Sequence, residues 1–290
     1  MLIVTLLTAP ARPSLDPALV ESLRNAWGGG DAVWLAPDEA AEFAIPAEPD
    51  TARATWKELQ AHGVDLVISP AENRKKRLLL ADMDSTMIQQ ECIDELADEA
   101  GVGARVADIT ARAMNGELDF EGALIERVGL LKGLDSALIE SVLADRITLA
   151  SGAETLLRTL KANGVYTALV SGGFTAFTNR IAAQLGFDEN RANTLEADEG
   201  RLTGRAVPPI LGRAAKVTAL EDLTEKLGIT DADVLAVGDG ANDLGMLTRA
   251  GAGVALHAKP AVAAEVDLRI NHGDLTALLY LQGYSRDDFV

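Results

Sequence analysis

The chain of 290 residues is poor in several residue types, and each shortage limits what the protein can be. Cys92 is the single cysteine, so no intramolecular disulfide can form, which is typical of proteins of the reducing cytoplasm. We interpret Cys92 as a small buried apolar residue rather than a nucleophile. No apolar run approaches the roughly 20 residues that a transmembrane helix needs. The first apolar run, residues 2–9, lacks the basic flank of a signal peptide. We therefore expect a cytoplasmic protein without a membrane partner.

Positive charge is also scarce. The chain has 26 lysines and arginines against 44 aspartates and glutamates, which gives a formal net charge of −18. A field of this sign repels nucleic acids and anionic lipids, so we expect no nucleic-acid partner. The remaining composition, 48% hydrophobic and 24% charged, is that of a globular protein, and the length suggests about two domains.

Residues 1–70 predict a small domain of their own. Pro17 falls in the first turn of one expected helix, and Asp50 is the expected cap of the other. The order β-α-β-β-α-β predicts a ferredoxin-like domain, which resembles the amino-acid-sensing, ACT-like domains of metabolic enzymes. No cluster of histidine, cysteine or carboxylate side chains in it suggests catalysis. Strands are expected at 2–7, 32–35, 41–45 and 64–69, and helices at 17–27 and 51–61.

Residues 71–77 join this domain to the rest of the chain. They contain four consecutive basic residues, a pattern that can resemble a nucleic-acid-binding signal. The segment abuts a buried strand in a strongly acidic chain, so we interpret it as a solvated linker.

Residues 78–290 alternate strands with helices, which predicts a doubly wound parallel α/β sheet. Between the first two strands, about residues 88–148 are helical without interruption. This stretch predicts a helical insertion placed as a cap over the sheet. Strands are expected at 78–81, 165–170, 192–196, 201–205, 234–237, 253–256 and 268–270, and cap helices at 88–100, 106–115, 120–131 and 136–147.

Three of the predicted strands end in polar residues: 82–84, 171–173 and 238–243. The carboxyl ends of parallel strands lie on one edge of a sheet, so these residues should meet there. The gathered carboxylates would repel one another without a hard cation, and oxygen ligands favour Mg²⁺. Ser171 and the following glycines offer donors to an anion, and Lys216 offers positive charge. Taken alone, an Asp-x-Asp pair more often makes a turn and a lysine is more often solvated; their coincidence favours a site.

These motifs resemble, in order and approximate spacing, those of the haloacid dehalogenase superfamily of phosphohydrolases. The likeness covers about residues 76–290 and is greatest to the members that hydrolyse O-phospho-L-serine in serine biosynthesis. It implies a Mg²⁺-dependent hydrolase with a helical cap. The residues that carry it are Asp82-Met83-Asp84-Ser85-Thr86, Ser171-Gly172-Gly173, Lys216 and Gly238-Asp239-Gly240-Ala241-Asn242-Asp243.

The resemblance also implies roles in catalysis and metal binding. Asp82 would attack phosphorus and form an aspartyl-phosphate, and Asp84 would act as general acid and then as general base. Mg²⁺ would be held by the carboxylates of Asp82 and Asp239 and by the main-chain carbonyl of Asp84. Asp243 would support the metal from its outer shell.

Substrate binding is implied for a further set of residues. Ser171, Gly172 and Lys216 would bind the phosphoryl group, and Asn242 lies in the same site. From the insertion, Glu91 would bind the ammonium group of the substrate and Arg127 its carboxylate. The same family likeness places two apolar residues of the insertion at the substrate, Met114 and Phe120.

Two other hypotheses stay open. One is a relative that acts on another small phosphomonoester, such as phosphohomoserine or phosphothreonine, or that transfers the phosphoryl group to an acceptor other than water. The other is a regulatory protein that binds an amino acid through residues 1–70 and has lost catalysis, although the intact Asp82 and Asp84 argue against it. The expected partner is a small-molecule substrate, and a homodimer is compatible with the sequence.

Overall fold

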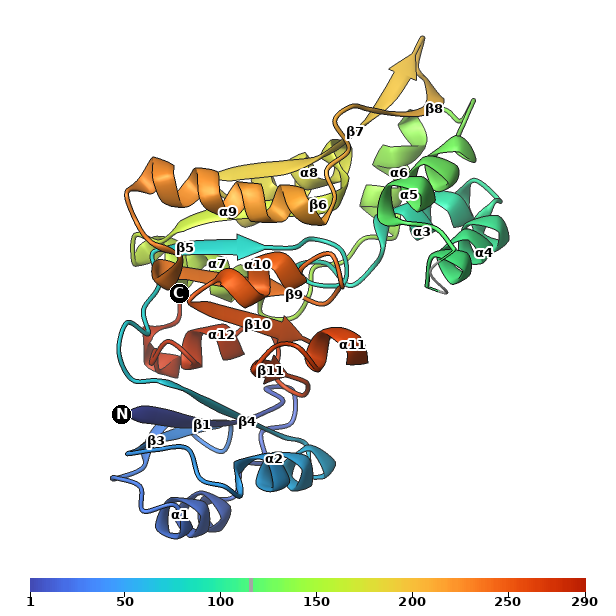
Figure 1. The fold of residues 1–290 in the computed structure, drawn as a ribbon. Coiled ribbons are helices and arrows are strands. Elements are labelled where there is room, and N and C mark those ends of the chain that lie inside the picture. The colour runs from blue at the N-terminus through green and yellow to red at the C-terminus, as the bar shows by residue number, and fades with distance from the viewer. Residues whose placement is uncertain (115–116) are drawn as a thin grey trace.

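The structure is a computed structural model that describes residues 1–114 and 117–290, with the side chain of Met114 outside the description. A small N-terminal sheet with two helices lies below a larger sheet, and a group of helices stands beside one edge of that larger sheet (Figure 1). Across the described part of the chain, no helix combines the length and the apolar character that a bilayer crossing requires.

The first 70 residues form the β-α-β-β-α-β unit that the sequence predicts. The sheet order is β2-β3-β1-β4 and every pairing is antiparallel, which is the ferredoxin-like arrangement. Alternate side chains of the first strand, Val4 and Leu6, are fully buried in one core with the two helices. The elements are β1 (Leu2–Thr8), α1 (Pro17–Ala26), β2 (Val33–Ala36), β3 (Ala40–Ile45), α2 (Ala52–Ala61) and β4 (Val64–Pro70).

The starts of the two helices differ in how well the sequence predicts them. Asp16 caps α1 by accepting a 2.8 Å hydrogen bond from the backbone of the helix, and Pro17 follows in the first turn, as expected. The prediction that Asp50 caps α2 is wrong. The N-cap is Thr51, whose backbone is helical and whose side chain makes no capping bond. Its hydroxyl instead accepts a 3.2 Å hydrogen bond from the indole of Trp27, which joins the two helices.

Residues 71–77 connect the two sheets, and most of them are exposed, as their charge predicts, but Arg74 and Lys76 are not. Lys76 is only 8% exposed, and its Nζ donates to the carbonyl of Ala232 at 2.7 Å. The guanidinium of Arg74 makes two bonds of 3.1 and 2.5 Å to the carboxylate of Glu42 in β3. A buried cation needs such partners, and here they come from both sheets.

The two sheets also meet through a buried carboxylate. Asp65 of β4 is fully buried and accepts hydrogen bonds from three consecutive backbone amides of the large domain, at 2.8–2.9 Å. These amides belong to residues 271–273, which follow the last strand of the large sheet. Charge-assisted bonds of this kind are strong, so the N-terminal unit is bound firmly to the edge of the large sheet.

The large sheet has the order β11-β10-β9-β5-β6-β7-β8. Neighbouring strands of this sheet pair in parallel, except that β7 and β8 form an antiparallel hairpin. The strands are β5 (Leu78–Ala81), β6 (Tyr166–Phe174), β7 (Glu189–Asp198), β8 (Arg201–Val207), β9 (Val234–Gly238), β10 (Ala252–Leu256) and β11 (Leu268–Ile270). The helices around them are α7 (Ala153–Ala162), α8 (Thr175–Leu185), α9 (Arg213–Leu227), α10 (Leu244–Arg249), α11 (Pro260–Ala263) and α12 (Ala277–Tyr280), with 3₁₀ turns at Asp231–Asp233 and Arg286–Asp288.

Strand β5 lies near the centre of this sheet and is buried on both faces. Leu79 and Ala81 pack in the core that contains α7, α8 and α12, whereas Leu78 and Leu80 pack in the core that contains α9 and α10. An unbroken apolar strand is what a parallel sheet covered on both sides requires. The predicted doubly wound sheet is therefore confirmed.

Four of the five described helices between β5 and β6, α3 to α6, form the predicted insertion, here called the cap (Figure 1). The first begins at Cys92 rather than near Ile88, because Ile88 pairs with Leu149 in an isolated bridge. The β7–β8 hairpin reaches the cap, and the Gly133 amide donates to the carbonyl of Leu202 at 2.7 Å. The cap helices are α3 (Cys92–Glu99), α4 (Gly103–Met114), α5 (Phe120–Gly129) and α6 (Ala137–Asp145).

Candidate active site

The carboxyl ends of β9, β5 and β6 meet on one edge of the sheet, as predicted, because these strands are adjacent and parallel. Over this edge lies a cavity of about 200 Å³ that the cap closes on the other side. Most of the predicted site residues line it: Asp82, Asp84, Gly172, Asp239 and Asn242 from the sheet edge, and Glu91, Phe120 and Arg127 from the cap.

Three further predicted residues, Ser171, Lys216 and Asp243, are almost fully buried behind that wall. The Nζ of Lys216 lies 2.6 Å from Oδ1 of Asp82 and 2.5 Å from Oδ1 of Asp243. Carboxylate oxygens of Asp82, Asp239 and Asp243 all lie within 4.8 Å of one another. Two buried carboxylates thus contact one buried ammonium group, and a third, that of Asp239, lies beside them.

The electrostatics of this cluster show that it lacks positive charge. Burial raises the pKa of Asp82 well above its ordinary value, and Asp243 raises it further, with only partial relief from Lys216. Burial also raises the pKa of Asp239 to about 6. Burial alone would lower the pKa of Lys216, but Asp82 and Asp243 outweigh it and raise that pKa to about 12. A hard divalent cation would balance the remaining charge, and the oxygen-only donor set fits Mg²⁺.

Asp84 is positioned by two donors. Its Oδ1 accepts from the amide of Cys92 at 2.8 Å, and its Oδ2 accepts from the hydroxyl of Ser171 at 3.2 Å. Burial, with a contribution from the charge of Glu91, raises the pKa of Asp84 to about 6. A fixed carboxyl group that changes protonation near neutral pH is suited to general acid–base chemistry.

Two side chains beside Asp84, those of Ser171 and Cys92, are buried and do not form the cavity surface. Ser171 is 2% exposed, and its hydroxyl donates to Asp84 while it accepts from the amide of Gly173 at 2.8 Å. Gly172, rather than Ser171, forms the surface of the cavity. Cys92 is buried, as predicted, and burial raises the pKa of its thiol, which disfavours the nucleophilic thiolate.

The cap contributes groups of opposite charge to the same cavity. Glu91 accepts a 2.8 Å hydrogen bond from the hydroxyl of Ser85. Arg127 is half-buried, its Nε donates to the carbonyl of Ala123 at 3.2 Å, and burial lowers its pKa. A ligand here can therefore present a cation to Glu91 and an anion to Arg127. The predicted substrate residue Met114 ends α4, and its side chain lies outside the described residues.

Sequence reasoning missed Lys259, which also lines the cavity. Its Nζ lies 3.5 Å from Oδ2 of Asp239. Lys259 follows β10, another parallel strand of the sheet whose carboxyl end reaches the same edge. That rule of sheet geometry would have identified this residue had it been applied to every predicted strand.

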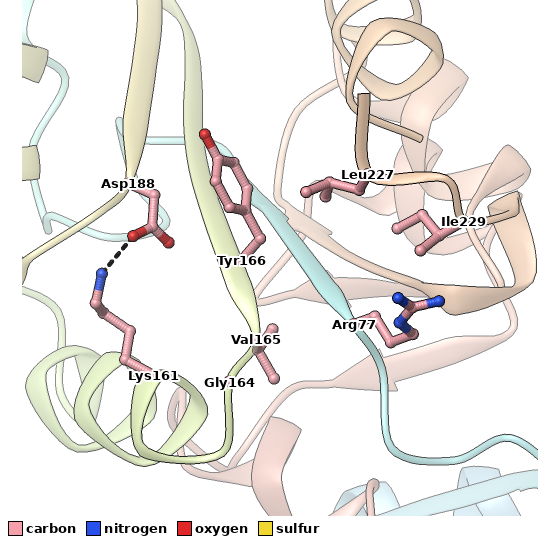
Figure 2. A pocket seen from close by; sticks show the side chains of 8 residues that line it. All are labelled: Arg77, Lys161, Gly164, Val165, Tyr166, Asp188, Leu227 and Ile229. Carbon is pink, nitrogen blue, oxygen red and sulfur yellow. Dashed lines mark hydrogen bonds and ion pairs between the residues drawn. The ribbon is translucent and has the colours of Figure 1, made fainter. Parts of the chain in front are cut away.

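A second hollow of about 360 Å³ lies at the opposite edge, where Arg77 precedes β5 and Tyr166 begins β6 (Figure 2). Lys161 and Asp188 form an ion pair of 2.6 Å in it, and the other lining side chains include Val165 and Leu227. Among the described residues that line this hollow, the single carboxylate is paired with Lys161, so the hollow has no cluster of carboxylates that could hold a metal ion. Such a cluster lies at the other edge of the sheet.

Comparisons with known proteins agree with this architecture. The family model of haloacid dehalogenase-like hydrolases matches residues 79–248. A phosphoserine phosphatase of Streptomyces coelicolor is 42% identical, and the match covers 99% of this chain and 71% of that protein.

Solved structures give the same answer. A HAD family hydrolase of Salmonella enterica serovar Typhi superposes with a TM-score of 0.87 at 33% identity and covers 97% of both chains. A substrate-bound phosphoserine phosphatase superposes with a TM-score of 0.67 at 43% identity, over 71% of this chain and 98% of that one. The chain belongs to the haloacid dehalogenase-like hydrolases.

Proposed function

We propose that this protein is a Mg²⁺-dependent phosphatase that hydrolyses O-phospho-L-serine to L-serine and phosphate. The observation that carries the proposal is the cavity of about 200 Å³ in which Glu91 and Arg127 face the carboxylates of Asp82 and Asp84. A small phosphorylated amino acid has the three charged groups that this arrangement can bind. Two of the relatives described above are phosphoserine phosphatases, which supports the same substrate.

The chemistry proceeds in two displacements at phosphorus. In the first, a carboxylate oxygen of Asp82 forms a bond to phosphorus while the bond from phosphorus to the seryl oxygen breaks. Asp84 donates its proton to the leaving seryl oxygen. In the second, a water oxygen attacks phosphorus, the acyl-phosphate bond to Asp82 breaks, and Asp84 takes the proton from that water. The pKa of Asp84, raised to about 6 by its burial and by Glu91, suits both steps.

The metal site would be built from the same edge of the sheet. Asp82, Asp239 and the main-chain carbonyl of Asp84 would hold Mg²⁺, with Asp243 beside them. When bound, the ion supplies positive charge that screens the nucleophile from the phosphate and stabilises charge developing in the transition state. The cluster of three carboxylates within 4.8 Å supports this choice of ligands.

The phosphoryl group would be bound by other residues of the same sheet edge. Lys216 supplies a fixed positive charge, Gly172 supplies a backbone amide, and Asn242 supplies a side-chain amide at the cavity wall. Ser171 orients Asp84 through its hydroxyl and forms part of the same loop.

The amino-acid part of the substrate would be bound by the cap. Glu91 would pair with the ammonium group, and the planar guanidinium of Arg127 would hold the carboxylate in a bidentate manner. Phe120 and Met114 would enclose the substrate and exclude water from the acyl phosphate.

We further infer that the two domains of the chain have different functions. Residues 78–290 form the catalytic unit with its cap at about 88–148, and residues 71–77 link it to residues 1–70, an ACT-like regulatory domain. The expected setting is the cytoplasm, with a homodimer as the expected assembly if the ACT-like domain associates.

Phosphate release from a panel of phosphomonoesters, with Mg²⁺ and with a chelator, tests the proposed function. Mg²⁺-dependent activity led by phosphoserine is expected. A higher kcat/KM for another ester, such as phosphohomoserine, would be compatible with the role of Asp82 but would reject phosphoserine as the preferred substrate. No activity on any ester, from a folded protein saturated with Mg²⁺, would reject catalysis.

A further inference from the structure

Asn193 of β7 is a buried side chain that the proposed chemistry does not use. It is 1% exposed, and its carboxamide makes three hydrogen bonds to two loops. Nδ2 donates to the carbonyl of Gly172 at 2.8 Å and to that of Leu211 at 3.1 Å, while Oδ1 accepts from the amide of Leu211 at 2.7 Å. A buried amide whose donors and acceptor are all paired is held in one orientation. Asn193 therefore fixes residues 171–173, which loop out within β6, relative to the loop before α9.

The first of these loops leaves the sheet at a bulge. Val170 of β6 pairs with Arg191 of β7, but the next pair is Phe174 with Asn193, so β6 contains two more residues than its neighbour. A bulge of this kind interrupts the ladder and turns the extra residues out of the strand. Here it brings Gly172 and Gly173 to the cavity wall, and the side chain of Asn193 donates a hydrogen bond to the carbonyl of Gly172.

The two loops together enclose the ring of Phe120, which comes from cap helix α5. A methyl group on Gly172 would lie 2.9 Å from Cζ of Phe120, and one on Gly212 would lie 3.1 Å from its Cδ1. The ring thus lies in a slot that a side chain at either of these two glycines would narrow. Asn193 bonds directly to Gly172 on one side of the slot and to Leu211, the neighbour of Gly212, on the other.

We propose that Asn193 is a positioning residue that sets the width of this slot and thereby seats Phe120 when the cap covers the cavity. The inference rests on the proposed function, because it assigns the slot to the active site. It makes Asn193 a requirement for a closed, water-excluding site, although the side chain touches neither the substrate nor the reacting atoms.

Asn193→Ala removes all three hydrogen bonds without changing any residue of the two loops. A small misplacement of a substrate-enclosing group can reduce the rate strongly, so kcat/KM for phosphoserine should fall roughly ten- to hundredfold. The matched control is Asn190→Ala on the same strand, where the side chain accepts a 2.7 Å bond from Thr178 but touches neither loop. It should change kcat/KM by less than about threefold.

A double-mutant cycle with Phe120→Ala separates positioning from a general loss of stability. If Asn193 acts through Phe120, adding Asn193→Ala to Phe120→Ala should lower kcat/KM by no more than about twofold further. Multiplication of the two single effects would overturn the proposal. Gly212→Ala narrows the slot without changing Asn193, and it serves as the second variant if Asn193→Ala does not fold. Its effect on kcat/KM should vanish in the Phe120→Ala background. An effect that persists in that background would contradict the proposal that the slot seats Phe120.

Hydrogen–deuterium exchange gives a readout that does not depend on turnover. Residues 171–174 and 210–213 should exchange faster in Asn193→Ala than in the parent, while Asn190→Ala leaves them unchanged. If the parent hydrolyses no ester, the proposed function fails, yet the exchange result still decides whether Asn193 holds the two loops. Unchanged exchange in both segments would overturn the inference.

Discussion

Lys216 and Asp82 form an ion pair beneath the cavity: Nζ lies 2.6 Å from Oδ1, and the two side chains are 2% and 6% exposed. The same ammonium group lies 2.5 Å from Asp243. The buried ammonium group thus has two carboxylate partners, and only the loss of both would leave its charge uncompensated. The pair therefore orients the carboxylate of Asp82 before a substrate arrives.

Asp82→Asn tests whether this carboxylate is the nucleophile. The amide has nearly the same shape, and Asp243 remains as a partner for Lys216, so the fold should persist. Without a carboxylate to attack phosphorus, kcat should fall by at least about a thousandfold. Phosphate release measures the loss, and circular dichroism verifies the fold. Asp16→Asn at the cap of α1 is the control, and a wild-type kcat in Asp82→Asn would mean that another group attacks phosphorus.

Mg²⁺ should stabilise the folded protein through Asp239. A ligand at about 100 times its Kd stabilises the native state by about 2.7 kcal/mol if it does not bind the unfolded chain. Urea unfolding with Mg²⁺ and with a chelator should show this difference in the parent and lose most of it in Asp239→Asn. Asp267→Asn, an exposed carboxylate away from the cluster, should keep it. Equal stabilisation in Asp239→Asn would exclude Asp239 as a ligand.

Much of this site could be predicted because its signals are local. The strand before Asp82 contains no polar residue, and its burial on both faces follows from that fact. The positions of Asp82, Ser171 and Asp239 on one edge then follow from the direction of parallel strands.

The parts that could not be predicted depend on contacts between distant segments. Asn193 is one polar residue in a strand, and its function arises only because the bulge at residues 171–173 brings Gly172 to it. Lys76 can be buried because a backbone carbonyl more than 150 residues away in the sequence accepts a hydrogen bond from its ammonium group. The failure of Asp50 as a cap is of another kind, since helix ends shift by a residue or two with small changes in backbone angle.

Arg127→Ala tests recognition of the substrate carboxylate. Loss of a bidentate charged contact should lower kcat/KM for phosphoserine roughly a hundredfold. Phosphoethanolamine has the phosphate and the ammonium but no carboxylate, so its kcat/KM should change by less than about threefold. Arg112→Ala is the matched control, because Arg112 lies on the cap but pairs with Glu126 at 2.8 Å on the exposed side. Equal losses for both esters would remove Arg127 from carboxylate binding.

Asp188, at the edge of the sheet opposite the active site, should make the free energy of unfolding depend on pH (Figure 2). Burial alone would raise its pKa, but a 2.6 Å bond from Lys161 and two bonds from Thr167, at 2.8 and 3.0 Å, outweigh burial and hold the pKa below its ordinary value of 3.8. Because the pKa is lower in the folded state, the stabilisation is fully present above pH 3.8. It is lost as the pH falls through the folded-state pKa.

Asp188→Asn should therefore destabilise the protein by about 1–2 kcal/mol at pH 7, the usual range for a partly exposed charged hydrogen-bond acceptor. The difference in free energy of unfolding between parent and variant, here called the gap, should narrow as the pH is lowered from about 5 to about 3. The reason is that the parent loses the carboxylate charge that the variant lacks at every pH. Urea unfolding across this range measures the gap. Glu154→Gln removes an exposed helical pair with Arg158 and should cost less than about 0.5 kcal/mol at any of these pH values. A gap that stays constant or widens on acidification would show that the carboxylate charge is not what stabilises this corner.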